Sequence, residues 1–381
     1  MASKFRLFTK RFFIYSNTIV VLFFLLACMV PFMNPQKWWF ISFMGLAFPF
    51  LLVIVVSFLI TWLLIKPRFA VISLLAIVIG LKSILVFFAF NKLGAFRYKK
   101  EPGTLRVMSW NVARFIEMKR NNNQGSQTRL KMLELIKQQE ADVLCLQEFF
   151  HSFDSTYYPN IDYIREEFGY PYWFYSHDID GDKHFTGSII FSRYPIIDSG
   201  MIRYPRPTLP DALMHADLAF NGDTVRVYTT HLQSLQFNKE DYQRINKIKE
   251  VDDSILTNSR TIFSKLKWGI ANRSIQADLI AQVLGDSPFP VIFCGDLNDV
   301  PNSYTYFTVK GEMQDAFLKK GFGIGRTFSS LSPTLRIDYI FADDHFKIRQ
   351  FNRVARRYSD HYMLVSDIAL KNSGENISLM K

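Results

Sequence analysis

Residues 291–299 read Val-Ile-Phe-Cys-Gly-Asp-Leu-Asn-Asp. The first four form a short apolar run of the length expected for a buried strand, and polar residues follow it at once. Asp296 and Asn298 are two residues apart, so in an extended segment their side chains point the same way. This stretch therefore predicts a strand that carries an acid and an amide to its end.

Short β-rich runs and helical runs alternate as far as about residue 370, which predicts an α/β fold. Asn221-Gly222 joins two of the runs and is a hairpin signal. The strands predicted before residue 291 are Leu105–Asn111, Val143–Gln147, Ser188–Ser192, Ala212–Phe220 and Thr224–Thr230. Those from residue 291 on are Val291–Cys294, Ile337–Phe341, Ile348–Val354 and Met363–Leu370. The predicted helices are Thr128–Gln139, Asp241–Leu256 and Ile270–Leu284.

Polar residues recur where these strands end, and rigid strand ends that border loops are where folds hold functional groups. A single Asp or His in such a place is usually a turn, cap or surface residue, so only the ordered set is informative. The set consists of Asn111, Glu148, His231, Asp296, Asn298, Asp338, Asp360 and His361.

The residue types fit phosphoester hydrolysis, which must stabilise negative charge on phosphoryl oxygens. Hard oxygen ligands suit Mg²⁺ or Mn²⁺, and Glu148 and Asp360 are of that kind. A carboxylate such as Asp296 can orient or deprotonate the attacking water. An imidazole can donate to a phosphoryl oxygen, and a second carboxylate can keep that imidazole charged.

The ordered run WNV, LQE, a glycine-led strand ending SRYPI, THL, GDLND, RIDYIF and SDH resembles the endonuclease/exonuclease/phosphatase superfamily over about residues 104–370. That superfamily includes deoxyribonucleases, abasic-site endonucleases, inositol polyphosphate phosphatases and bacterial sphingomyelinases. The resemblance implies an α/β fold built as a four-layer α/β/β/α sandwich. All the site positions of the family are intact in this chain.

The same resemblance assigns a role to each residue of the ordered set. It places Glu148, Asn111 and Asp360 at a Mg²⁺ or Mn²⁺ ion. It makes Asp296 the residue that activates water and Asn298 the one that positions phosphate. It also implies that His361 contacts the scissile phosphate and is oriented by Asp338, with His231 as a second phosphate-facing imidazole.

The first hundred residues differ from the rest in charge and polarity. They contain 12 basic residues and no acidic one, which leaves 33 basic against 34 acidic residues in the remainder. The net charge of +11 therefore comes from the N-terminal part. A basic total often indicates nucleic-acid binding, but here the soluble part is near neutral and does not support it.

Three apolar stretches, Phe12–Phe32, Trp39–Ile65 and Phe69–Phe90, each supply the ~20 residues that cross a bilayer as a helix. We predict three transmembrane helices within residues 1–91, a polar linker over 92–103, the catalytic domain over 104–371 and a polar tail over 372–381. The positive-inside rule leans towards an N-terminus in the cytoplasm, which places the catalytic domain outside it. The basic cluster formed by Lys92, Arg97, Lys99 and Lys100 argues for the opposite orientation.

Three functions compete on this evidence. The first is a membrane-anchored phosphoesterase whose partners are the lipid bilayer and a phosphoester substrate, with a lipid head group or a small phosphoester favoured. The second is a membrane-tethered nuclease, for which nucleic acid is the less favoured partner. The third is a non-catalytic membrane scaffold. The stretch Gln233–Gly269 resembles an insertion, either an amphipathic helix packed on the domain or a lipid-facing element.

Overall fold

The structure is a computed structural model that describes residues 2–371, apart from residues 93, 123, 182, 209–210, 236, 238–239, 242, 244 and 246–254. The chain forms two compact units. The N-terminal unit comprises Met1–Phe88, Leu235–Ser274 and Asp299–Thr308, and the sheet unit comprises Ala89–Ser234, Ile275–Asn298 and Val309–Lys381. The predicted extent of the catalytic domain, residues 104–371, stays a prediction.

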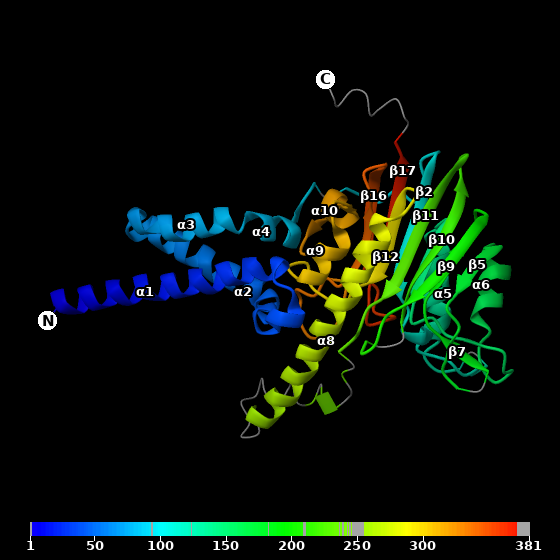
Figure 1. Ribbon diagram of the computed structural model, residues 1–381, viewed down its shortest axis with the longest axis horizontal. Helices are drawn as coiled ribbons and strands as arrows, with labels where there is room; N and C mark the ends of the chain where they lie inside the picture. Colours follow the sequence, from blue (N-terminus) through cyan, green and yellow to red (C-terminus); the bar gives the residue numbers. More distant parts are fainter. Residues whose placement is uncertain are drawn as a thin grey trace. The chain divides into compact units, whose positions relative to one another are not determined.

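The sheet unit contains two six-stranded sheets (Figure 1). The first has the order β16-β17-β2-β3-β8-β5. Its strands are β2 (Thr104–Asn111), β3 (Val143–Gln147), β5 (Tyr172–Tyr175), β8 (Ile189–Ser192), β16 (Phe346–Val354) and β17 (Met363–Leu370). The second has the order β13-β15-β12-β11-β10-β9. Its strands are β9 (Ile196–Arg203), β10 (Ala212–Phe220), β11 (Asp223–His231), β12 (Val291–Asp296), β13 (Gln314–Asp315) and β15 (Asp338–Ala342).

Smaller elements complete the sheet unit. A three-stranded sheet contains β4 (His151–Ser152), β6 (Asp178–Ile179) and β7 (His184–Thr186), and β1 (Ala89–Phe90) pairs with β14 (Phe322–Gly323). The helices are η3 (Ala113–Phe115), α5 (Thr128–Gln138), α6 (Asn160–Phe168) and α10 (Ala316–Lys320). Two further helices contribute residues to both units, α8 (Ile255–Gly285) and α9 (Tyr304–Lys310).

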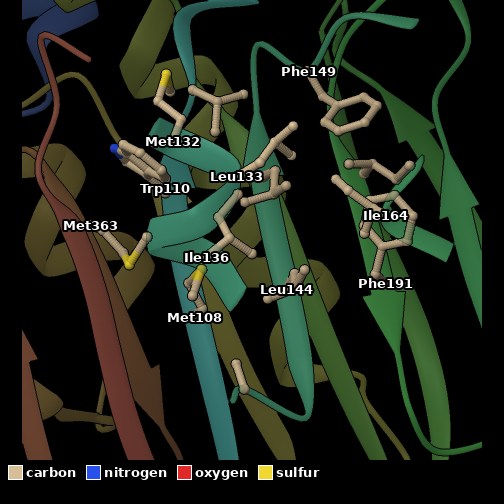
Figure 2. Close-up of a cluster of buried hydrophobic side chains, with 14 of the residues drawn as sticks. Met108, Trp110, Met132, Leu133, Ile136, Leu144, Phe149, Ile164, Phe191 and Met363 are labelled. Atoms are coloured by element: carbon tan, nitrogen blue, oxygen red, sulfur yellow. The ribbon is translucent and has the colours of Figure 1, made fainter. Parts of the chain in front are cut away.

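The inner strands of the first sheet are buried on both faces, which explains the nearly continuous apolar runs in β3 and β8. In β2, Leu105 and Val107 join a cluster that also contains residues of the second sheet, so these faces of the two sheets pack together. Met108 and Trp110 point the other way, because side chains alternate along a strand, and they pack against α5 and α6 (Figure 2). The outer face of the first sheet is thus covered by helices.

Most predicted elements are confirmed, and their ends shift by a residue or two. The helix predicted over Ile270–Leu284 is wrong at its start, since α8 begins at Ile255. Strand β9 and helix α6 were not predicted. Most of the predicted helix Asp241–Leu256 and the whole polar tail lie outside the described residues.

The N-terminal unit begins with the helices α1 (Ala2–Met29), η1 (Val30–Phe32), α2 (Pro35–Ile65), η2 (Pro67–Phe69), α3 (Ala70–Ile79) and α4 (Leu81–Phe87). Two spans, Phe5–Phe32 and Pro35–Ile65, are long and apolar enough to cross a membrane. Many of their large side chains are exposed, Phe12 and Val53 among them. In water such a surface would be unfavourable, so it indicates a membrane environment.

The prediction of a third continuous transmembrane helix is wrong. The stretch forms α3 and α4, which meet at Gly80 with a bend of 63°. A Cβ atom at Gly80 would lie 2.7 Å from the ring of Phe24 and 2.9 Å from Sγ of Cys28. Glycine therefore lets α1 approach the chain closely where the helix breaks. Helices α3 and α4 are long and apolar enough to cross a membrane only if the bent pair is taken as one span.

Contacts inside the N-terminal unit join its distant segments. Phe263 of α8 stacks on Phe43 of α2 with ring centroids 4.5 Å apart. Asn302 donates from Nδ2 to the carbonyl oxygen of Ala27 at 2.8 Å, one of the last four carbonyls of α1, which have no partner within the helix. Part of the predicted insertion therefore packs on an apolar N-terminal helix. Residues 246–254 of the predicted insertion lie outside the described residues.

Candidate active site

Strand pairing brings the predicted site residues together. Each large sheet has one parallel pair, β2 with β3 and β11 with β12, and parallel strands end at the same edge of a sheet. In the first sheet Asn111 therefore lies opposite Gln147, the residue before Glu148. In the second sheet His231 lies opposite Asp296, and Asp296 opposite Asp338. Register alone thus aligns three of the polar residues across one sheet.

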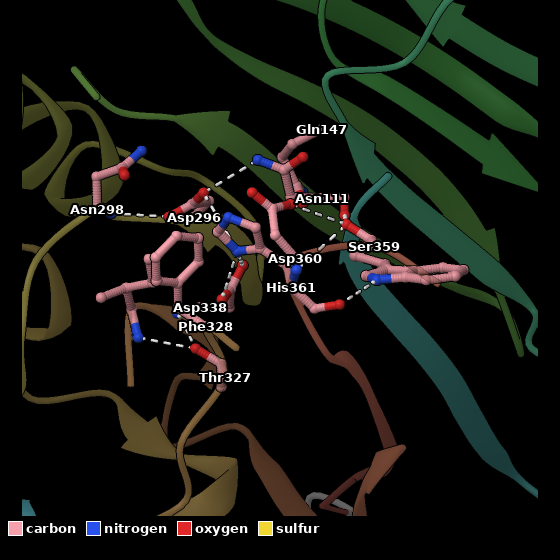
Figure 3. Close-up of polar contacts among 12 residues, drawn as sticks. Asn111, Gln147, Asp296, Asn298, Thr327, Phe328, Asp338, Ser359, Asp360 and His361 are labelled. Atoms are coloured by element: carbon pink, nitrogen blue, oxygen red, sulfur yellow. Dashed lines mark hydrogen bonds and ion pairs between the residues drawn. The ribbon is translucent and has the colours of Figure 1, made fainter. Parts of the chain in front are cut away.

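Asp296 lies at the centre of the cluster, with its side chain fully buried (Figure 3). Asn111 donates from Nδ2 to Asp296 Oδ2 at 3.1 Å and to Glu148 Oε1 at 3.0 Å. The backbone N–H of Asn298 donates to Asp296 Oδ1 at 2.8 Å. Residues from both sheets therefore hold this carboxylate in place, and the amide of Asn111 joins it to Glu148.

The pKa of Asp296 is raised to about 6, since burial and the charge of Asp338 disfavour its ionised form. His361 and His231 act in the opposite direction. A carboxylate with a pKa near neutrality accepts a proton more readily than an ordinary aspartate. Position and proton affinity both suit Asp296 to the deprotonation of a water molecule.

His361 and Asp338 form a buried pair. Nδ1 of His361 lies 3.0 Å from both carboxylate oxygens of Asp338 and 3.6 Å from Asp296 Oδ2. Burial opposes the charge on the ring, but the two aspartates raise the pKa of His361 to about 10. The pair is fixed on its other sides, since Trp110 donates to the His361 carbonyl oxygen at 2.9 Å and the Phe328 ring lies 5.0 Å from the imidazole. His361 is thus held as an imidazolium that can donate from Nε2.

His231 faces the same cluster from the end of β11. Its Nε2 lies 3.6 Å from Glu148 Oε1 and 3.8 Å from Asp296 Oδ2. Burial disfavours the charged ring, but Asp211, Asp296 and Glu148 together raise the pKa of His231 above its ordinary value. Asn298 Nδ2 lies 3.1 Å from the same Nε2. Asn298 can donate to this nitrogen only while the imidazole is neutral. When the ring is protonated, Nε2 is itself a donor and interacts with the carboxylates of Glu148 and Asp296 instead.

Glu148 and Asn111 can offer neighbouring hard oxygen atoms to a divalent cation. The Glu148 side chain is 39 % exposed. Although burial acts against the charge, His231 and the hydrogen bond from Asn111 lower the pKa of Glu148. Its backbone φ is +49°, a costly conformation for a residue with a Cβ and a frequent feature of functional sites. An ionised, accessible carboxylate beside an amide fits Mg²⁺ or Mn²⁺.

Asp360 differs from the other predicted ligands. Its side chain is exposed, and Oδ1 lies 3.2 Å from the hydroxyl of Ser359. That hydroxyl also donates to the Asn111 carbonyl oxygen at 2.8 Å, which ties the Ser-Asp-His loop to the end of β2. In the described part of the chain the Asp360 carboxylate makes no direct hydrogen bond to Glu148 or Asn111. Its role as a metal ligand stays a prediction.

Asp296, Asp338 and His361 also lie close enough together to hold a metal ion, with one ligand atom of each within 4.8 Å of the others. The hydrogen bonds from His361 Nδ1 to Asp338 and the raised pKa of His361 argue against that use. A protonated nitrogen cannot bind a cation. This trio is therefore better suited to proton transfer than to holding a metal ion, and Glu148 with Asn111 offers other oxygen atoms that a cation could use.

A cavity of about 350 Å³ opens beside Glu148 and His231. Three further charged residues that line it were not predicted as site residues: Arg114, Asp178 and Asp211. Arg114 follows Asn111 closely in the sequence, which was the one available signal. Asp178 and Asp211 belong to no motif, and they reach the cavity only through the tertiary fold.

Gly187 shows why one wall of this cavity needs a glycine. Its φ is +135°, and an added Cβ would lie 2.0 Å from Ser176 Oγ and 2.4 Å from Asp178 Oδ2. The positive φ and the short distances to the added Cβ would each be enough to exclude any residue other than glycine here. The close packing holds Asp178 at the cavity, where Arg203 forms an ion pair with it.

Comparison with known proteins gives two family matches. A model described as the Endonuclease/Exonuclease/phosphatase family matches residues 108–361, and one described as a domain of unknown function matches residues 10–87. No curated protein matches the chain.

Several solved structures are similar to this chain at low sequence identity. An endonuclease/exonuclease/phosphatase from Beutenbergia cavernae is 18% identical, with a TM-score of 0.50 over 72% of this chain and 73% of that one. The human Nocturnin catalytic domain is 18% identical, with a TM-score of 0.46 over 72% and 97%. A humanized D. rerio TDP2 is 18% identical, with a TM-score of 0.46 over 70% and 99%.

The family match includes every residue of the cluster, from Asn111 to His361. It covers well over half of the 381 residues. The chain therefore belongs to the endonuclease/exonuclease/phosphatase family.

Proposed function

We propose that the protein is a membrane-anchored, divalent-metal-dependent phosphoesterase that hydrolyses a phosphodiester or phosphomonoester. The observation that carries this proposal is the convergence of Glu148, Asp296 and His361. Asn111 joins the two carboxylates by hydrogen bonds, and His361 Nδ1 lies 3.6 Å from Asp296 Oδ2. These residues come from three separate parts of the sequence. The burial of Asp296 and His361 has a cost that a purely structural role would not require.

In this proposal Asp296 accepts the proton of the attacking water, and Asn298 orients the phosphate. His361 donates from Nε2 to a phosphoryl oxygen, while Asp338 holds the ring at Nδ1 and keeps it charged. A bound Mg²⁺ or Mn²⁺ would supply positive charge to the phosphoryl oxygens. Glu148 and Asn111 would hold that ion, with Asp360 as a further ligand.

The cavity walls support a substrate with few phosphates. Asp178, Asp211 and Glu148 line it, against Arg114 and His231. Carboxylates that line the cavity repel the successive phosphates of a nucleic-acid backbone, whose binding depends on Lys and Arg. A lipid head group or another small phosphoester avoids that repulsion.

The two apolar helices support the membrane anchor. We propose that they cross the bilayer, and that the α3–α4 pair completes a third, bent crossing. With the N-terminus in the cytoplasm, the sheet unit then lies outside it. The four-layer α/β/β/α arrangement is part of this proposal too.

The test uses the full-length protein purified in detergent, with panels of phospholipids, small phosphodiesters, RNA and DNA, each with and without Mg²⁺. We expect metal-dependent hydrolysis of phospholipid or a small phosphoester. Asp296→Asn and His361→Gln should each lower kcat by roughly 10²–10⁴-fold. Asp344→Asn, an exposed aspartate with a side chain 92 % exposed, is the matched control and should keep full activity.

Each other result has a clear meaning. Hydrolysis of DNA or RNA alone would replace the proposed substrate class with the nuclease alternative. If no substrate is hydrolysed with metal, or if the two site variants match the control, the enzyme assignment is wrong and the scaffold alternative takes its place.

A further inference from the structure

The segment that follows the apolar helices is bound to the sheet unit and does not hang free as a linker. Strand β1 pairs with β14, and Asn91 donates from Nδ2 to the carbonyl oxygens of Leu318 at 2.9 Å and Gly321 at 2.8 Å. Further along, Lys100 forms a close ion pair with Asp142 at 2.6 Å. Both ends of the segment 89–100 are therefore fastened to the sheet unit.

Arg106 fastens the middle of the segment. Its guanidinium is fully buried, donates to the carbonyl oxygens of Arg97 and Tyr98, and forms a two-pronged ion pair with Asp367 at 2.6 and 2.9 Å. Gln350 bonds both the N–H and the carbonyl oxygen of Arg97. This backbone is thus held in one position against β16 and β17.

A cavity of about 270 Å³ lies between the fastened segment, α10 and β16. Five of its lining residues are basic: Lys92, Arg97, Lys99, Lys320 and Arg349. Only two are acidic, and both have partners. Asp367 is neutralised by Arg106, and Glu101 lies 3.7 Å from Arg97.

Four cations therefore remain for a ligand: Lys92, Lys99, Lys320 and Arg349. All four are exposed, and within the described residues none forms an ion pair. Grouping four like charges around one cavity is unfavourable unless an anion binds there. Phe96 and Phe351 line the same cavity and add apolar surface.

Membrane topology explains only half of this arrangement. Lys92 and Lys99 follow the apolar helices directly, where basic residues commonly set the orientation of a membrane protein. Lys320 and Arg349 are more than 220 residues further along the chain, where that rule does not apply. The fold brings them to the same cavity, which indicates a binding function.

We infer that this cavity binds the phosphate group of an anionic phospholipid, with Phe96 and Phe351 against its glycerol and upper acyl chain. The bilayer is the source of the ligand, because Lys92 lies only five positions after Phe87, the last residue of α4. Five residues of chain span at most about 18 Å. The inference rests on the proposed membrane anchor but not on catalysis.

The experiment measures lipid retained by the full-length protein with native mass spectrometry. Phosphatidylglycerol and phosphatidylcholine with the same acyl chains are compared, so that only head-group charge differs. We expect the protein to retain phosphatidylglycerol preferentially. The double substitution Lys320→Gln and Arg349→Gln should weaken that retention on the order of tenfold.

The matched control is the double substitution Lys319→Gln and Lys347→Gln, which removes the same charge from adjacent exposed positions outside the cavity. It should retain phosphatidylglycerol as the unmodified protein does. A second pair, Lys92→Gln with Lys99→Gln, tests the opposite wall of the cavity and should repeat the loss even if the first pair impairs folding.

Three results would overturn the inference. One is equal retention of the two lipids, and another is an equal loss in the cavity and control variants. The third is displacement of the lipid by inorganic phosphate, which would identify free phosphate as the ligand. Hydrolysis by the cavity variants is measured alongside, so a failure here is distinguishable from a failure of the proposed phosphoesterase.

Discussion

His361 Nδ1 lies 3.0 Å from both carboxylate oxygens of Asp338, deep in the sheet unit. The two residues are 23 positions apart in the sequence, on a strand and on the loop that precedes another strand of the other sheet. Because both oxygens face the same ring nitrogen, the aspartate fixes the tautomer and the charge of the imidazole together. The opposite nitrogen, Nε2, is thereby left as a donor.

Asp338→Asn should disable the enzyme without emptying its metal site. The amide keeps the shape but loses the charge that holds His361 protonated, so we expect kcat to fall on the order of 10²–10⁴-fold. KM should change little, because Asp338 has no proposed contact with substrate. Steady-state kinetics and Mg²⁺ titration check both points.

The conservative change Asp338→Glu serves as the partner variant. The glutamate retains the negative charge beside His361, so we expect it to recover part of the lost kcat. The pH above which kcat falls should also return to that of the unmodified protein. Wild-type kcat in Asp338→Asn would refute the orienting role.

Glu148→Gln should weaken metal binding, because a neutral amide oxygen replaces the accessible carboxylate beside Asn111. We expect the dissociation constant for Mn²⁺ to rise at least about tenfold, as measured by isothermal titration calorimetry. Chelation with EDTA should abolish hydrolysis in the unmodified protein.

The same titration of Asp360→Asn decides the role of Asp360. A loss of affinity comparable with that of Glu148→Gln would make it a ligand. If Glu148→Gln binds Mn²⁺ as tightly as the unmodified protein, the ion is held elsewhere.

His151 should make the fold sensitive to acid. Its imidazole is buried, and Nδ1 accepts the N–H of Ile161 in the first turn of α6 at 3.3 Å. Burial lowers the pKa of His151 below 6.5, opposed by Asp162 and assisted by His177. The unfolded state therefore takes up a proton first, so this stability is present above about pH 6.5 and is lost as the pH falls below it.

Denaturant unfolding at several pH values measures this effect. The decline in the free energy of unfolding should be shallower in His151→Gln, by up to about 1 kcal/mol per pH unit. His345→Gln, at a side chain that is 60 % exposed, should leave the slope unchanged. Equal slopes in all three proteins would contradict the assignment.

Arg106→Gln should destabilise the sheet unit, because it leaves the buried carboxylate of Asp367 without its charged partner. Breaking a buried pair in this way costs roughly 3–5 kcal/mol. The surface pair Arg97–Glu101, with side chains 77 % and 53 % exposed, supplies the control, and Arg97→Gln should cost less than about 1 kcal/mol. Similar losses in the two variants, measured by unfolding in detergent, would show that burial does not set the cost.

Local sequence patterns were sufficient for much of the fold. The strands β3, β10 and β17 were predicted to the residue, because burial on one or both faces leaves a readable pattern of apolar side chains. Glu148, directly after β3, was readable for the same reason. Patterns also separated the apolar N-terminal hundred residues from the rest.

Contacts between distant segments could not be read in this way. The bend at Gly80 depends on the approach of Phe24 and Cys28 from another helix. The cavity beside Glu148 and His231 is lined by Asp178 and Asp211, which have no sequence signal. The cavity lined by basic residues brings Lys320 and Arg349 beside Lys92. Such neighbours are set by strand register and helix packing, since these depend on residues far apart in the chain.

By itself, therefore, the sequence determined the types of element, the family resemblance and the order of the polar residues. Only the tertiary structure decided which of those residues meet, that Asp296 is buried between His361 and Asn111, and that the segment after the apolar helices is fastened to the sheets. The physical reason is range. The alternation of apolar and polar residues that identifies a strand or helix repeats within a few residues, so the sequence shows it. Hydrogen bonds and charge interactions form between whichever groups the fold brings together, however far apart they are in the chain.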